Sequence, residues 1–166
     1  MTPAEAVALL REIRDKVAAA APGMADAMGG VHERRMKDLL SRSFHAPVTW
    51  TPAPAGGPPA LMTGRLRASV TAAPGLRGGA RASSLAGPDT IYAGTHEYGA
   101  PGRQGEPYMW LWVRYVGPSE VRARGWVRGT VNIPARPYVR PSRDQVIADG
   151  SVTAAGDAAF MRYVFS

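Results

Sequence analysis

The sequence predicts a single domain of the α+β class. N-terminal helices, an antiparallel β-sheet of about four or more strands with a long proline-rich loop or arm, and a C-terminal helix packed on the sheet are expected. Three observations predict this class: apolar residues at helical spacing in the first third, short β-rich segments between turn signals in the middle, and a partly helical pattern at the end. The length of 166 residues suits one modest core. The expected parts are a helical region (1–45), a proline-rich loop or arm (46–62), a β-rich core (63–140) and a C-terminal helical segment (141–166).

The N-terminus carries the signals of a helix start. Thr2 is a good N-cap, Pro3 suits the first helical position, and Glu5 completes the Thr-x-x-Glu capping box. Glu12 and Lys16 form an i,i+4 pair. An apolar face follows at helical spacing, made by Leu10, Ile13 and Val17.

This first helix is expected to end near Ala21, because Pro22-Gly23 interrupts the pattern. A second apolar series then predicts a second helical segment, in which Gly29-Gly30 makes a kink possible. Its members are Met24, Met28, Val31, Met36, Leu39 and Leu40.

The composition changes abruptly between Ala46 and Met62, which hold five prolines and two glycines. Proline lacks the backbone N–H and disfavours helix at the residue before it, so this run is not regular helix. We expect a loop, or an extended arm over Ala46 to Ala60 that reaches an adjacent subunit.

The middle of the chain predicts short strands. The segments RASVTAA (67–73) and ARASSLAG (80–87) flank PGLRGG and suggest a β-hairpin. The clearest strand is YMWLWVRYV, Tyr108 to Val116, and GWVRGTVNI (125–133) is a plausible partner. After Pro141 the pattern is partly helical, weakened by Gly150 and Gly156.

The net charge of +7 is concentrated in the centre of the chain. Residues 61–143 hold twelve arginines and four acidic residues, a net charge of +8. Such a region could contact phosphates, which makes a basic nucleic-acid-binding module one candidate function. The arginine-rich, lysine-poor composition is also explained by GC-rich coding.

Composition also bears on cellular location. The chain has no cysteine, which rules out disulfides and thiolate chemistry and fits synthesis in a reducing cytoplasm. Charges interrupt the apolar positions of the N-terminus, so we expect neither a signal peptide nor a membrane span, and a soluble protein.

The pair His96-Glu97 resembles part of the zinc-peptidase motif H-E-x-x-H. Ala100 stands where the second histidine belongs, and the other histidines, His32 and His45, lie far away in the N-terminal part. No phosphate loop, dinucleotide fingerprint or nucleophile elbow is present in the sequence. We therefore expect no enzyme, no metal and no cofactor.

Three short blocks follow one another in a fixed order: MTGRLRASV, YAGTHEYGA and NIPARPYVRPS. Together they resemble blocks of the bacteriophage neck and tail-completion proteins, a group that includes the Mu-like virion morphogenesis family and related minor tail components of long-tailed phages. The matching residues are Thr63, Gly64, Leu66, Arg67 and Ser69; Tyr92, Ala93, His96, Glu97 and Gly99; and Ile133, Pro134, Ala135, Arg136, Pro137 and Tyr138. Tyr138 stands where phenylalanine is usual, which suits a packed ring whose hydroxyl reaches water or a partner.

The resemblance implies a structural virion protein that forms a ring, as a hexamer, at the head–tail junction. Its partners would be neighbouring neck, tail-terminator or tail-tube proteins and head–tail adaptor proteins, with DNA passing through without sequence-specific contacts and no membrane involved. The protein would be made in the bacterial host cytoplasm and reside in the virion. Arg114, Arg122, Arg124 and Arg128 are candidates for lining the DNA channel, and Trp110 and Trp112 for subunit contacts.

The first two blocks also have a physical interpretation as architecture. In the first, Gly64 allows a turn, Thr63 caps a short helical turn and Leu66 anchors it. In the second, a helical turn is expected to end at Gly99 in a left-handed conformation, with His96 hydrogen-bonded to backbone or to Glu97.

In the third block, prolines stiffen the chain before the last helix and hold Arg136 between them. Two hypotheses remain open for this arginine: an ion pair with Glu97, or a contact with a neighbouring subunit.

Overall fold

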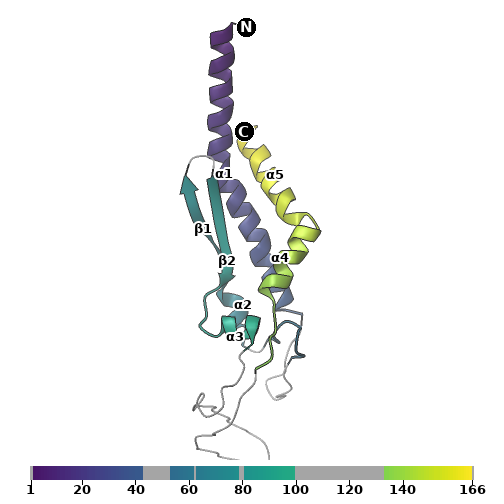
Figure 1. The fold of residues 1–166 in the computed structure, drawn as a ribbon. Coiled ribbons are helices and arrows are strands. Elements are labelled where there is room, and N and C mark those ends of the chain that lie inside the picture. The colour runs from purple at the N-terminus through teal and green to yellow at the C-terminus, as the bar shows by residue number, and fades with distance from the viewer. Residues whose placement is uncertain (1, 43–52, 62, 79–80, 100–132, 166) are drawn as a thin grey trace, which may run out of the picture.

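The computed structural model describes residues 2–42, 53–61, 63–78, 81–99 and 133–165. Its helices and strands confirm the α+β class (Figure 1). In chain order the elements are α1 (Pro3–Leu39), α2 (Arg65–Ser69), β1 (Val70–Gly78), β2 (Arg81–Pro88), α3 (Ala93–Tyr98), α4 (Val139–Ala148) and α5 (Ser151–Val164). The expected strands at 108–116 and 125–133 fall wholly or almost wholly outside the described residues.

The start of α1 is as predicted. Thr2 Oγ1 accepts a hydrogen bond from the Glu5 backbone N–H at 3.3 Å, and the Thr2 N–H donates to Glu5 Oε2 at 2.6 Å, so the capping box is complete. The exposed pair of Lys16 and Glu12 also forms, at 3.0 Å.

The expected break at Pro22-Gly23 is wrong, because α1 continues through Pro22 as one helix of 37 residues. A proline inside a helix costs about 3 kcal/mol or more, and packing must offset that cost here. Arg77 of β1 donates from Nη1 to the Pro22 carbonyl at 3.0 Å and pairs with Asp26 at 2.5 Å, which ties this turn to the hairpin. The helix bends part-way along its length (Figure 1), as prolines cause helices to do.

The predicted β-hairpin is confirmed. Strands β1 and β2 are antiparallel, with Val70 opposite Pro88 and Ala72 opposite Ala86, and the register shifts between Pro74 and Arg77. The first residues of the expected strand, 67–69, belong instead to α2.

The hairpin packs along α1 through a close approach at Gly29. A Cβ at Gly29 would lie 2.1 Å from Ser84 Oγ and 2.8 Å from Ser84 Cβ, so only glycine fits. One turn further, Glu33 Oε2 accepts the Ala72 backbone N–H at 2.8 Å. The glycine expected to mark a kink therefore serves as the contact between helix and sheet.

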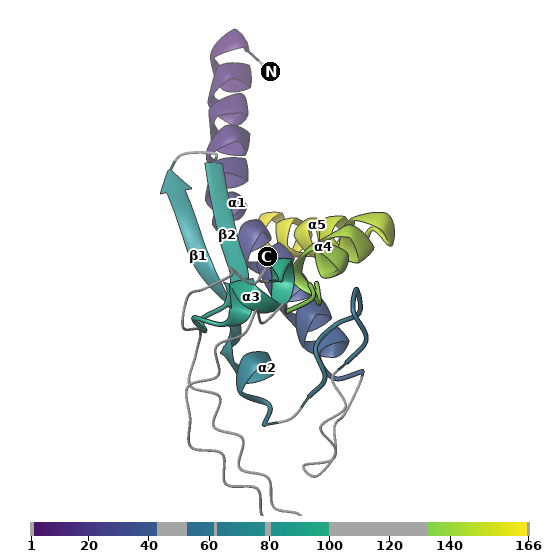
Figure 2. The same ribbon diagram turned by 60° about the horizontal axis from the view of Figure 1, so that its bottom comes forward.

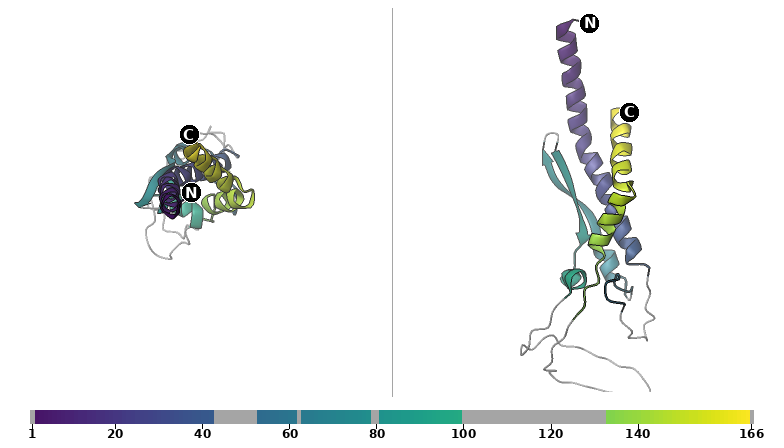
Figure 3. Two further views of the ribbon diagram at one scale, coloured as in Figure 1. Left: turned by 90° about the horizontal axis from the view of Figure 1, so that it is seen from above. Right: turned by 45° about the vertical axis from the view of Figure 1, so that its right-hand side comes forward.

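The C-terminal segment forms two helices that meet at Gly150, whose φ of 69° lies in the left-handed region. Both helices pack mainly on α1. The contact between α5 and α1 is close at Gly156, where an added Cβ would lie 3.3 Å from Met28 Sδ. Viewed from above, α1 lies between the hairpin and α5 (Figure 3). The C-terminal helix was expected to pack on the sheet. Instead, the C-terminal helices pack on the apolar face of α1.

The buried core lies at the end of α1 away from the N-terminus (Figure 2). Met36 and Leu40 of this end, Val70 of β1 and Tyr138 before α4 form its centre. Leu66, Ala86 and Val139 pack around them. Across the described ranges, no helix is long and apolar enough to span a membrane.

Candidate functional site

The three sequence blocks meet at the start of α4. Block one provides α2, block two provides α3, and block three runs from Ile133 into α4. Leu66 packs against the core that contains Tyr138, and the Arg136 backbone N–H donates to the His96 carbonyl at 2.6 Å. Segments separated by up to about half of the chain thus form one junction, which we call the α4 junction.

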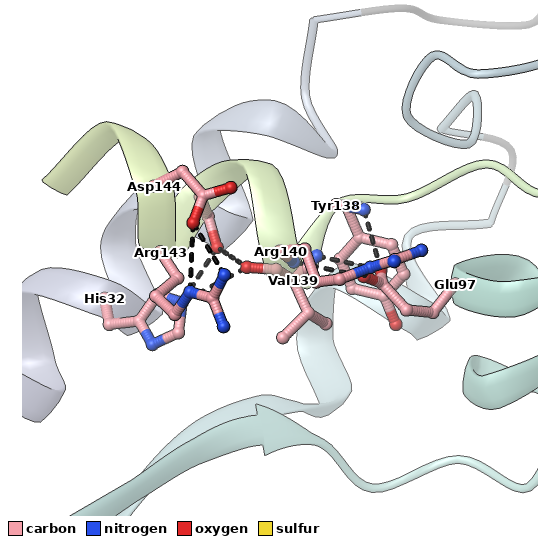
Figure 4. Close-up of polar contacts among 8 residues, drawn as sticks. His32, Glu97, Tyr138, Val139, Arg140, Arg143 and Asp144 are labelled. Carbon is pink, nitrogen blue, oxygen red and sulfur yellow. Dashed lines mark hydrogen bonds and ion pairs between the residues drawn. The ribbon is translucent and has the colours of Figure 1, made fainter. Parts of the chain in front are cut away.

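Glu97 is the centre of the α4 junction. Glu97 is 3% exposed, and its carboxylate faces the first turn of α4 (Figure 4). Oε2 accepts the backbone N–H groups of Tyr138 at 2.8 Å and Val139 at 2.9 Å, while Oε1 accepts that of Arg140 at 3.0 Å. The Nε of Arg140 also donates to Oε1, at 3.2 Å. Glu97, which lies 41 positions before Tyr138 in the chain, therefore caps the start of α4.

The electrostatics of Glu97 favour its ionised form. Burial by itself raises the pKa of this carboxyl, but the hydrogen bonds from Tyr138, Val139 and Arg140 outweigh burial and hold the pKa below its usual range. The positive end of the α4 dipole acts in the same direction. The side chain of Arg140 adds charge from a partly exposed position, 5.4 Å above the Tyr98 ring.

The hypothesis that Glu97 pairs with Arg136 is wrong. Arg136 is itself buried, but its Nε donates to the Ala53 carbonyl at 2.8 Å and its Nη1 reaches the Pro134 carbonyl at 3.5 Å. The backbone amides of α4 occupy the carboxylate instead, because three N–H groups at a helix start converge on one acceptor site.

The partner of Arg136 belongs to the proline-rich segment. Ala53 is buried, and the Gly56 N–H donates to the Ala135 carbonyl at 2.9 Å. Residues 53–61 therefore fold back onto their own chain, as the loop alternative predicts and the arm alternative does not. The earlier part of that arm, 46–52, lies outside the described residues.

His96 does not make the hydrogen bond expected for it. Its Nδ1 is buried and has no partner among the described residues, and its ring packs edge-on against Tyr92, with centroids 5.8 Å apart. Burial lowers the pKa of His96, and the nearby Arg136 charge lowers it further, so the imidazole stays neutral. A neutral, packed ring suits architecture.

α3 ends at Gly99, as predicted, but Gly99 does not adopt the expected left-handed conformation. Its φ of 74° and ψ of 175° fall in a region that is essentially restricted to glycine, although ψ is extended rather than left-handed helical. A Cβ would lie 2.7 Å from the Ile133 carbonyl oxygen and 2.9 Å from the Ala135 nitrogen. Glycine is required here both for the backbone conformation and for the close approach of block three.

In the first block the helical turn forms as predicted, but Gly64 rather than the expected Thr63 stands at the N-cap of α2. Gly64 has a φ of 73° and occupies the N-cap position of α2, while Thr63 Oγ1 accepts the Arg65 N–H at 3.4 Å. Leu66 anchors the turn against the core, and Arg67 is exposed.

Tyr138 is fully buried, so its ring packs as expected. Its hydroxyl is also buried and has no partner in the described part of the chain, contrary to the expectation of a hydroxyl that reaches water or a partner. Burial raises the pKa of Tyr138, and the charge of Glu97 raises it further, so the phenol is neutral. In the same block, Pro134 is exposed and Pro137 half-buried.

One part of the α4 junction was missed by sequence reasoning. Ser142 is fully buried and donates from Oγ to the Val139 carbonyl at 2.7 Å, while His32 Nε2 of α1 lies 2.9 Å from that Oγ. Since the hydroxyl proton is directed to Val139, His32 donates its Nε2–H to the oxygen. No sequence signal pairs residues 110 positions apart, so only the fold reveals this link between α1 and α4.

The remaining candidates cannot be placed. The channel candidates Arg114, Arg122, Arg124 and Arg128 and the contact candidates Trp110 and Trp112 lie outside the described residues. Within the described ranges, no group of three histidine, aspartate or glutamate side chains is arranged to hold a metal ion.

The geometry of the α4 junction limits its chemistry. Four N–H donors occupy the two oxygens of Glu97, and His96 is packed against Tyr92. The arrangement fixes three segments relative to one another and leaves the carboxylate without a free site for substrate. Comparison of the chain with protein-family models, curated proteins and solved structures finds no match.

Proposed function

We propose that this protein is a structural component of a tailed bacteriophage or phage-like particle. It forms a ring, as a hexamer, at the head–tail junction, where it completes the tail and helps head and tail to join. The proposal rests on the resemblance of the three blocks, and one structural observation carries it further: the α4 junction uses those blocks to hold the fold together.

The Glu97 carboxylate is the strongest support for an architectural role. A general base or a metal ligand needs a lone pair directed at substrate or metal. In Glu97 the oxygens instead accept three backbone N–H groups and one arginine N–H within the chain. The His96-Glu97 pair therefore serves the fold.

The ring would act through its surfaces. It would contact neighbouring neck, tail-terminator or tail-tube proteins on one side and head–tail adaptor proteins on the other, and DNA would pass through it without base-specific contacts. Such a protein is made in the host cytoplasm and ends in the virion.

The competing function, a basic nucleic-acid-binding module unrelated to virions, gains little from four of the seven described arginines of the basic centre. Arg77 pairs with Asp26, Arg140 with Glu97 and Arg143 with Asp144. Arg136 is buried against backbone carbonyls. Arg77, Arg136 and Arg140 thus have roles within the fold, and the charge of Arg143 is partly balanced by Asp144. Arg65, Arg67 and Arg81 of the basic centre are exposed.

Deletion of the gene tests the proposal. Electron microscopy of the resulting particles should show filled or fillable heads and separately assembled tails that fail to join, because other proteins build both structures. Complementation with the wild-type chain should restore joined particles. Normal, joined and infectious particles from the deletion strain would refute the assignment.

A zinc-dependent alternative is tested in the same system. Chelator treatment of purified wild-type protein should leave its assembly unchanged, because no metal is required. Loss of assembly with chelator and recovery with zinc would contradict the architectural proposal.

A further inference from the structure

The N-terminal half of α1 carries large apolar side chains that the described part of the chain leaves exposed. Val7, Leu9, Leu10, Ile13 and Val17 are 47%, 48%, 66%, 49% and 42% exposed. In Figures 1 and 3 this half of the helix projects beyond both the tip of the hairpin and the C-terminal end of α5. We call residues 3–19 the projecting segment.

The exposed face continues a face that is covered further along the same helix. Leu10, Ile13 and Val17 are followed by Ala20, which is 2% exposed, and by Met24, which lies against Gly156 of α5. The steps between these positions alternate between three and four residues, the spacing of a helix–helix seam. The seam packs against α5 inside the molecule and continues, without a described partner, into the projecting segment.

The charge of this segment favours a second copy of the chain as the partner. The whole chain carries +7, so copies of it repel one another on average. Residues 2–21 hold three acidic and three basic side chains and are neutral. Exposed pairs of Lys16 with Glu12 and Arg14 with Asp15 already balance charge along this surface. Two copies of this neutral segment can therefore approach each other without electrostatic repulsion. A strongly charged partner would not be attracted, because the segment has no net charge of opposite sign.

We propose that the projecting segment packs against the same segment of a second copy, with Leu10, Ile13 and Val17 at the contact. A twofold axis relates the two segments, because one face of a helix meets the same face of a copy at such an axis. This inference rests on the proposed function for its role, which is to join copies in pairs within the assembly. The contact itself is inferred from the exposed apolar side chains, their helix–helix spacing and the neutral charge of the segment. It can be tested on the isolated protein.

Cysteine cross-linking provides the most direct test, because the full-length chain contains no cysteine. Leu10→Cys is compared with Leu85→Cys on β2, since these leucines are 66% and 69% exposed. Under mild oxidation, Leu10→Cys should form disulfide-linked dimers about ten-fold faster or more, because contact raises the effective concentration of the thiols. Equal rates for the two variants would overturn the inference.

Light scattering with circular dichroism supplies the second test. Leu10→Glu should lower the mass of the assembly, Leu85→Glu should leave that mass unchanged, and both variants should keep the helix content of the wild type. An assembly that survives Leu10→Glu would overturn the helix contact and leave the ring proposal standing.

The two proposals fail separately. If another part of the same chain covers the projecting segment, Leu10→Cys will not cross-link and the helix contact is refuted. If Leu10→Cys cross-links but deletion of the gene leaves particles normal, the helix contact stands and the tail-completion role is refuted.

Discussion

The two ends of α1 differ in how far their apolar side chains are buried. At the end near the α4 junction, Met36 and Leu40 are buried in the core and His32 donates to Ser142. At the other end, Leu10 is 66% exposed. One helix thus has buried core side chains at one end and an exposed apolar face at the other.

The contrast separates folding from assembly. Side chains at the α4 junction are matched within the chain, so changes there should lower the free energy of unfolding. Side chains of the projecting segment have little to lose on unfolding, because much of their area is exposed in the folded chain. Changes there should alter association and spare stability.

The largest effect is expected from Glu97→Ala. The substitution leaves three N–H groups of α4 without their acceptor and should lower the free energy of unfolding by about 3 kcal/mol. Chemical denaturation measures this loss. Asp144→Ala is the matched control, since that carboxylate is exposed beside Arg143 and its removal should change stability by about 0.5 kcal/mol or less. Equal losses in the two variants would show that Glu97 is not the centre of the junction.

A smaller effect is expected from Gly99→Ala. The methyl group would meet the Ile133 carbonyl oxygen and the backbone would be strained, at a cost of about 2 kcal/mol. Gly94→Ala is the control within the same helix, because nothing lies within 4 Å of its added Cβ. Thermal unfolding should separate the two variants clearly. If they melt together, block three does not approach Gly99 as closely as described.

The smallest of the three effects is a loss of stability in acid. His96 has a lowered pKa in the fold, so the unfolded chain binds more protons and stability falls once the pH drops below the ordinary value of 6.5. Glu97 also has a lowered pKa; its contribution is complete above the ordinary value of 4.5 and is lost as the pH falls through the folded value. Denaturation as a function of pH should therefore show a first decline below 6.5 and a further decline below 4.5.

Two variants show which group causes each decline in stability. His96→Gln should remove the decline between pH 6.5 and 4.5. Glu97→Gln should reduce the decline below 4.5, to which Glu33 also contributes because its hydrogen bond with Lys37 lowers its pKa. A decline below 6.5 that is unchanged in His96→Gln would mean that another group is responsible.

Local signals made much of the fold predictable. The capping box at Thr2, the hairpin around residues 74–79 and the end of α3 at Gly99 each depend on neighbours in sequence, and the structure confirms them. Pro22 misled the prediction, because the packing of Arg77 and Asp26 beside it cannot be seen in the local pattern.

The α4 junction was predictable only in part. The sequence marked Glu97 and Arg136 and left two partners open for the arginine, Glu97 or a neighbouring subunit. In the fold Glu97 instead accepts the α4 amides, and Arg136 donates to the Ala53 carbonyl. Backbone donors have no sequence signature, so a side chain that caps a distant helix cannot be recognised from spacing alone. The link from His32 to Ser142 was hidden for the same reason.

Hydrogen exchange along the chain tests the central contrast most directly. The amides of Tyr138, Val139 and Arg140 should be protected in the wild type at every protein concentration, because Glu97 holds them within one chain. Amides of the projecting segment should exchange quickly in dilute protein and gain protection as concentration rises and copies associate. Unprotected amides at 138–140, or protection of residues 3–19 that is the same at all concentrations, would contradict the account.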